Sequence, residues 1–83
     1  MELKRWSVEI YINEDGDDTD VRAVLSTVDR TVAAGAGQAR RNPVDRLVPE
    51  IGDELATGRA LIDLGHRLVQ LAASDVRESV SHG

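Results

Sequence analysis

Apolar and polar residues alternate over two stretches near the N-terminus. The first stretch, at about residues 5–13, has apolar residues at Trp6, Val8, Ile10 and Ile12. The second, at about residues 19–28, places Val21, Ala23, Leu25 and Thr27 on one face and Arg22 and Ser26 on the other. A period of two predicts half-buried strands, because successive strand side chains point to opposite faces. Between them, the Asp15-Gly16 pair predicts a tight hairpin turn with a positive φ.

A third strand is predicted at about residues 31–41, and one of its faces consists only of small residues. This row contains Ala33, Gly35, Gly37 and Ala39. Glycine weakens a strand unless another backbone must approach it closely. We therefore expect a helix to cross this small-residue row. Asn42-Pro43 ends the strand, since proline cannot donate a hydrogen bond to the sheet.

The rest of the chain has helical spacing. Pro49 suits the first turn of a helix, so we predict a helix over about residues 50–73 and a tail over 74–83. Gly58 and Gly65 lie on its apolar stripe, and we expect them to pack against the glycines of the third strand. The spacing of Asp63 and Arg67 predicts an ion pair on the solvent side. The stripe expected to face the sheet contains Ile51, Leu55, Leu61, Ile62, Leu64, Leu68, Val69, Leu71 and Ala72.

The order β-β-β-α predicts an α+β fold in one domain, residues 1–83. It consists of a three-stranded antiparallel sheet with one long C-terminal helix packed on one face. A single helix leaves the other face of the sheet open. A contiguous apolar patch there would pair two subunits, so we expect a homodimer. The residues expected on this open face are Tyr11, Val24, Val28, Val32 and Ala36.

The composition favours self-association and excludes several classes of protein. The chain has no Phe and no Cys, one Trp and one Tyr, and a net charge of −5. A small aliphatic core supplies about 3–5 kcal/mol of net stability. Without Cys there are neither disulfides nor thiolate metal sites. The N-terminus lacks the apolar run of a signal peptide, and no stretch reaches the ~20 apolar residues of a membrane span. We expect a cytoplasmic protein without membrane contact.

The strings GAGQARRNP and IGDELATGRALIDLGHRL, in the order β-β-β-α, resemble an actinobacterial family of small proteins of unknown function. The resemblance extends from Trp6 to Val76. The family is described as having a fold like the double-stranded RNA-binding domain. The resemblance therefore implies that fold, here without its usual N-terminal helix. It implies no catalytic or binding residues, because none are assigned in the family.

One basic cluster lies between the third strand and the helix: Arg40, Arg41 and Arg46. It is a candidate contact for an anion or a protein partner. The alternative interpretation is a solvated strand end whose charge is balanced by Asp45 and Glu50. Exposed ion pairs of this kind are common and contribute little to stability.

Binding of duplex RNA is the second functional alternative. It requires cations near phosphates, and RNA-binding domains of this fold carry lysines at the start of their final helix. Here that position holds Glu50, Asp53 and Glu54, and the segment 50–78 contains six acidic residues and three arginines. We therefore expect nucleic acid not to be the partner.

No catalytic motif stands out. The serines lack a G-x-S-x-G context, and the Gly35–Gly37 segment lacks the third glycine of a nucleotide-binding loop. The acidic stretch 13–20 does not match a calcium loop. The two histidines, His66 and His82, are too few for a catalytic zinc site. We expect a non-enzymatic interaction module that self-associates and uses no cofactor or metal.

Overall fold

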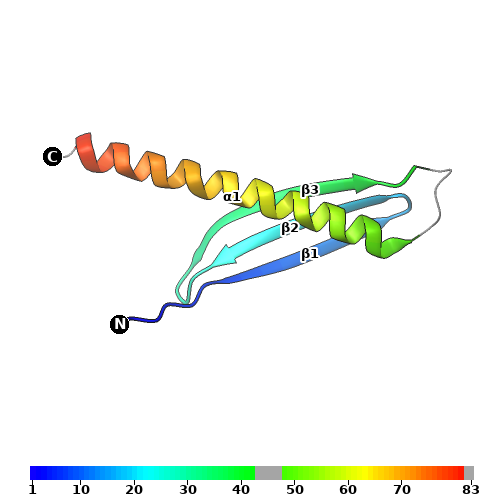
Figure 1. Ribbon diagram of the computed structural model, residues 1–83, viewed down its shortest axis with the longest axis horizontal. Helices are drawn as coiled ribbons and strands as arrows, with labels where there is room; N and C mark the ends of the chain where they lie inside the picture. Colours follow the sequence, from blue (N-terminus) through cyan, green and yellow to red (C-terminus); the bar gives the residue numbers. More distant parts are fainter. Residues whose placement is uncertain (43–47, 82–83) are drawn as a thin grey trace.

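The structure is a computed structural model that describes residues 1–42 and 48–81 (Figure 1). Within these residues, strands β1 (Ser7–Asp15), β2 (Asp18–Ser26) and β3 (Thr31–Arg40) form one antiparallel sheet in the order β1-β2-β3. Helix α1 (Pro49–Ser81) follows and packs on one face of this sheet. The predicted β-β-β-α architecture of the α+β class is confirmed.

The first hairpin turn is tighter than the sequence pattern alone suggests. Strand pairing continues to Asp15 and Asp18, which face each other across the turn. Gly16 has a φ of 61°, and the neighbouring Asp17 has a negative one. This combination is typical of a type II′ turn, in which glycine occupies the first central position. The positive φ predicted for the Asp15-Gly16 pair is confirmed.

Thr27 organises the second turn rather than continuing β2. Its amide donates to the carbonyl of Arg30 over 2.8 Å. Its Oγ1 accepts hydrogen bonds from the amides of Asp29 and Arg30, both over 3.3 Å. The prediction that Thr27 lies on the inward face of the strand is wrong, because the pairing shifts register at Leu25/Ser26 and the strand ends there.

The hydrophobic core is small. Val21, Ala23 and Leu25 of β2 are buried under the helix, which confirms their inward assignment. The other buried hydrophobic residues are Ala39, Ala56, Ala60 and Leu64. Most members of this core are therefore alanines, and each adds little apolar area.

The helix approaches β3 at backbone distance. A Cβ atom added to Gly35 would lie 2.5 Å from the carbonyl oxygen of Ala60 and 2.8 Å from the Cα of Leu64. A Cβ atom added to Gly37 would overlap the carbonyl oxygen of Ala56 and lie 2.9 Å from the carbonyl carbon of Arg59. The prediction that a helix crosses this small-residue row is confirmed.

The predicted inward stripe of the helix is confirmed at Leu64 and Leu68, but its other members are exposed. Ala56, Ala60 and Leu64, spaced four residues apart, face the sheet, and both alanines are 0% exposed. Ile62 and Val69, predicted to face inward, are 61% and 70% exposed. The physical reason is the glycine row: the backbones can come this close because the helix presents the methyl groups of Ala56 and Ala60 there, which turns Ile62 and Val69 outward.

Gly58 and Gly65 do not pack against β3 either. A Cβ atom added to either residue would meet no atom of the sheet or of a distant part of the described chain within 4 Å. The predicted glycine-to-glycine packing between helix and strand is therefore wrong. Alanine methyl groups on the helix, rather than its glycines, fill the space above Gly35 and Gly37.

Helix α1 continues past Ala73 to Ser81 and is longer than the sheet beneath it. It crosses the sheet obliquely, and its C-terminal part extends beyond the strands (Figure 1). Residues 69–79 are all exposed. The radius of gyration is 16.7 Å, whereas a compact chain of this length has a radius of about 12 Å. The overall dimensions are 58 × 27 × 19 Å.

Candidate functional site

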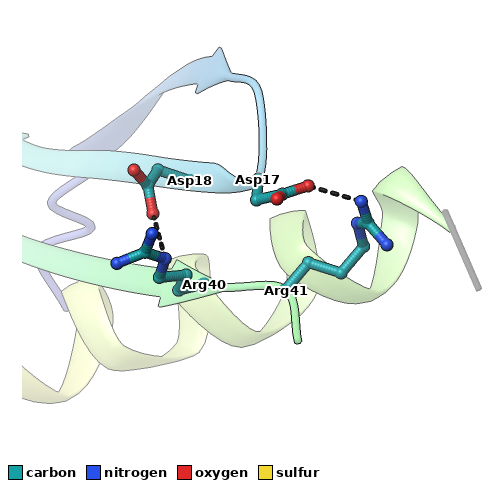
Figure 2. Close-up of polar contacts among 4 residues, drawn as sticks. All are labelled: Asp17, Asp18, Arg40 and Arg41. Carbon is teal, nitrogen blue, oxygen red and sulfur yellow. Dashed lines mark hydrogen bonds and ion pairs between the residues drawn. The ribbon is translucent and has the colours of Figure 1, made fainter. Parts of the chain in front are cut away.

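The predicted basic cluster lies where the end of β3 meets the β1–β2 turn (Figure 2). The Nε of Arg40 is 3.5 Å from Oδ1 of Asp18, and both side chains are more than half exposed. The Nη2 of Arg41 donates to Oδ1 of Asp17 over 2.5 Å. The amide of Arg41 also donates to the carbonyl of Asp17 over 2.8 Å. Arg46, the third member of the cluster, lies outside the described residues.

These contacts fasten the end of β3 to the hairpin turn. Each of the two described arginines faces a carboxylate, so the four side chains in Figure 2 carry no net charge. An incoming anion would meet two aspartates together with the two arginines. This arrangement favours a structural role over anion binding, because a carboxylate already occupies the best position for an anion.

The start of the helix carries negative charge. Glu14, near the end of β1, shares a hydrogen bond with Asp53 in the first turns of α1. This hydrogen bond raises the pKa of Glu14, and repulsion from the carboxylates of Asp53 and Glu50 adds to the effect. Carboxylates gathered at this point are poor neighbours for a phosphate, because like charges repel.

Of the residues predicted to form a self-association face, Val28 and Val32 lie away from the open face of the sheet. Tyr11 of β1 pairs with Arg22, and Val24 of β2 pairs with Glu9. These two residues therefore lie on neighbouring strands. Val28 lies in the β2–β3 turn and is 91% exposed. Val32 packs against the core cluster.

The open face of the sheet also contains polar and charged groups. The hydroxyl of Tyr11 donates to Oε2 of Glu9 over 2.5 Å. This hydrogen bond, with repulsion from the same carboxylate, raises the pKa of the tyrosine. Arg22 faces Tyr11 across the strand pair, and a shallow depression next to them is also lined by Ala34 and Ala36. Apolar contact on this face is therefore interrupted by a carboxylate and a guanidinium group.

The large exposed apolar surfaces lie instead on the helix side of the molecule. On β1, Val8, Ile10 and Ile12 are 37–47% exposed, because the helix packs mainly over β2 and β3. The sequence pattern predicted that these residues share one face of a half-buried strand. An outward row of the helix was not predicted from the sequence: three of its members were assigned to the inward stripe, and the fourth, Val76, to the tail. This row consists of Leu55, Ile62, Val69 and Val76.

Two helix side chains cover the free edge of β3. The amide of Ala36 donates to Oδ2 of Asp63 over 2.9 Å. The Nη1 of Arg59 donates to the carbonyl oxygen of Gln38 over 2.7 Å. The predicted pair of Asp63 and Arg67 is confirmed, with 3.1 Å between Oδ2 and Nε. Unpaired groups on an edge strand are a template for pairing with other chains, and these contacts occupy two groups of that template.

The charge on Asp63 should make part of the stability dependent on pH. The hydrogen bond from the Ala36 amide, followed by that from Arg67, lowers the pKa of Asp63 from its ordinary value of 3.8. Its stabilising contribution is therefore complete above 3.8 and is lost as the pH falls through the lowered pKa. We expect Asp63→Asn to lower Tm by a few degrees at neutral pH, and the difference from the wild type to close at low pH.

Thermal unfolding followed by circular dichroism between neutral and acidic pH measures this difference. Asp75→Asn, which removes an exposed carboxylate from the same helix, is the control. A deficit of Asp63→Asn that persists unchanged at low pH would show that the ionised carboxylate is not what binds the strand edge.

The described residues contain neither a metal-binding cluster nor a membrane-spanning helix. No group of three or more His, Asp or Glu side chains in residues 1–42 and 48–81 is arranged to hold a metal ion. The helix in the described part of the chain lacks the run of apolar residues needed to cross a membrane.

Comparisons with known proteins agree on the family. The family model described as Rv2632c-like matches residues 4–83. An uncharacterised protein of Mycobacterium bovis, Mb1767, is 45% identical over 80 residues, covering 96% of this chain and 83% of the relative. The uncharacterised Mycobacterium tuberculosis protein Rv2632c is 41% identical over 76 residues, covering 92% and 81%. The crystal structure of Rv2632c superposes with a TM-score of 0.83 at 39% identity, covering 95% of this chain and 93% of that one.

Proposed function

The chain belongs to the Rv2632c-like family, and we propose that it is a non-enzymatic interaction module that acts as a homodimer. The observation that supports this proposal best is the surface area. The chain exposes 6788 Å², whereas a compact folded chain of 9.0 kDa exposes about 4,900 Å². The difference of about 1,900 Å² exceeds the ~800 Å² that each partner contributes to a standard protein interface.

The distribution of apolar residues supports the same proposal. Among the described buried hydrophobic residues, only Val21, Leu25 and Leu64 are larger than alanine. Large aliphatic side chains remain exposed on both β1 and α1. A monomer would gain little from this core and would leave much apolar area in water. Association of two copies removes that area without any new folded element.

Sedimentation equilibrium over micromolar concentrations tests the proposal. We expect the mass of a dimer, together with a Tm that rises with protein concentration, because dissociation and unfolding are then linked. A single species of 9.0 kDa at every concentration, with a Tm independent of concentration, would contradict the proposal.

Binding of duplex RNA has less support. The two described arginines of the basic cluster face Asp17 and Asp18, and the helix start carries the Glu14–Asp53 carboxyl pair. Both features lower the positive potential that an RNA backbone requires. A gel shift showing tight, salt-sensitive binding of duplex RNA would reverse this ranking.

A further inference from the structure

We propose that the second copy packs its α1 helix along the outward row of α1, Leu55, Ile62, Val69 and Val76, and approaches most closely at Gly58 and Gly65. This inference rests on the proposed self-association and specifies its interface. The occupant is another copy of this chain, and the contact is between two helices rather than between two sheets.

The four aliphatic residues form a single line along the helix. They are spaced seven residues apart, which is close to two helical turns, so each lies almost above the previous one. They are 47%, 61%, 70% and 62% exposed in chain order. Ala60, which is 0% exposed against the sheet, is two residues before Ile62 and therefore lies on nearly the opposite side of the helix. The row thus faces away from the chain's own sheet.

A second line of small residues accompanies the row. Gly58, Gly65 and Ala72 each follow an aliphatic member by three residues, giving the alternating three-and-four spacing of a helix-to-helix seam. Glycine is among the least favourable residues inside a helix. Apart from the adjacent residues and the nearby helix backbone, no described atom lies within 4 Å of a Cβ added at Gly58 or Gly65. Packing within one copy therefore does not account for these glycines, whereas a closely approaching second helix does.

The extent of the row matches what a second copy offers. From Leu55 to Val76 it runs for about 31 Å. It begins over the sheet and continues into the part of α1 that extends beyond it, where residues 69–79 are all exposed (Figure 1). Another α1 has the same length and the same repeat, as a symmetric interface requires. The surface in excess of a compact chain, about 1,900 Å², provides enough area for such an interface.

Substitution of Gly65 by leucine tests the inference, because Gly65 is exposed and an added Cβ there meets no sheet atom, so the new side chain would obstruct a second helix. We expect Gly65→Leu and Ile62→Asp to keep their circular dichroism spectra and to raise the dissociation constant of the dimer at least ~100-fold, by loss of packing at the centre of the seam. Gln70→Leu, at an exposed position of the same helix outside the row, should leave the dissociation constant unchanged.

Cross-linking gives an independent measurement, because the chain has no cysteine of its own. Gly65→Cys should form an intersubunit disulfide on mild oxidation, since such a bond requires Cα atoms within about 7 Å. Gln70→Cys should not.

An unchanged dimer in Gly65→Leu, together with a dimer lost in Ile10→Asp, would place the interface on β1. That result would overturn the helix interface and leave self-association standing. A monomeric wild type would overturn both proposals.

Discussion

Gly37→Ala is expected to abolish stable folding. The added methyl carbon would overlap the carbonyl oxygen of Ala56 and lie 2.9 Å from the carbonyl carbon of Arg59. These are backbone atoms inside a helix, so they cannot rotate away as the end of a flexible side chain could. The helix must move off the sheet as a unit. Overpacking of a core costs about 1–3 kcal/mol and more where backbone must shift, against a net stability of about 3–5 kcal/mol.

Circular dichroism and urea unfolding measure this effect. Ala36→Val is the matched control, because Ala36 is next to Gly37 in β3 and is exposed on the opposite face of the sheet. A β-branched residue suits that position, so we expect stability close to that of the wild type. If Gly37→Ala unfolded at the same urea concentration as the control, the close contact between helix and strand would be wrong.

Leu64→Ala is expected to produce the second largest loss. Leu64 is 4% exposed and is the only residue larger than alanine that α1 contributes to the described core. It packs above Gly35, where the sheet has no side chain to fill the space left behind. Truncation of a buried leucine costs about 2–5 kcal/mol. In a core this small, that is a large part of the total stability.

The midpoint of urea unfolding, measured with an unchanged m-value, gives the size of the loss. Leu61→Ala removes the same atoms three residues earlier on the same helix, where the side chain is 44% exposed. We expect this control to cost less than half as much. Equal losses of stability at the two positions would contradict the burial of Leu64 against the sheet and the exposure of Leu61.

The alternation of apolar residues and the turn chemistry predicted much of the fold. Val21, Ala23 and Leu25 alternate clearly, and the charged Arg22 decides which face is inward. Gly16 carries the positive φ that its position after Asp15 predicts. The small-residue row around Gly35 and Gly37 predicts the close approach of a helix. Glycine weakens a strand, so its presence inside one is best explained by another backbone that must come close.

The rotation of the helix could not be predicted from hydrophobicity. Helical spacing favours the side with the largest apolar residues, such as Ile62 and Val69. The sheet selects the side with the smallest residues, because Ala56 and Ala60 are the ones that fit against two glycines. The four-residue spacing of Ala56 and Ala60, small residues that complement the glycines of β3, indicates the side of the helix that faces the sheet. The hydrophobicity of a residue indicates how often it is buried, but it does not describe the shape of the sheet surface against which this helix packs.

The surroundings of the expected contact residues could be predicted from the sequence only in part. Arg40 and Arg41 are adjacent in the chain, but their aspartate partners at positions 17 and 18 become visible only when β3 pairs with β2. Val32 appeared to belong to the open face because strict alternation was assumed. The register shift at Leu25/Ser26 breaks that alternation, and Val32 packs against the core.

The covering of β3 by Asp63 and Arg59 has a consequence for assembly. Continuous growth of a sheet, as in a fibril, requires that both of its edges accept a strand. Here two backbone groups of the third strand are already bonded to helix side chains, so this edge is less able than β1 to accept a strand. Lateral polymerisation of this protein is therefore disfavoured at β3.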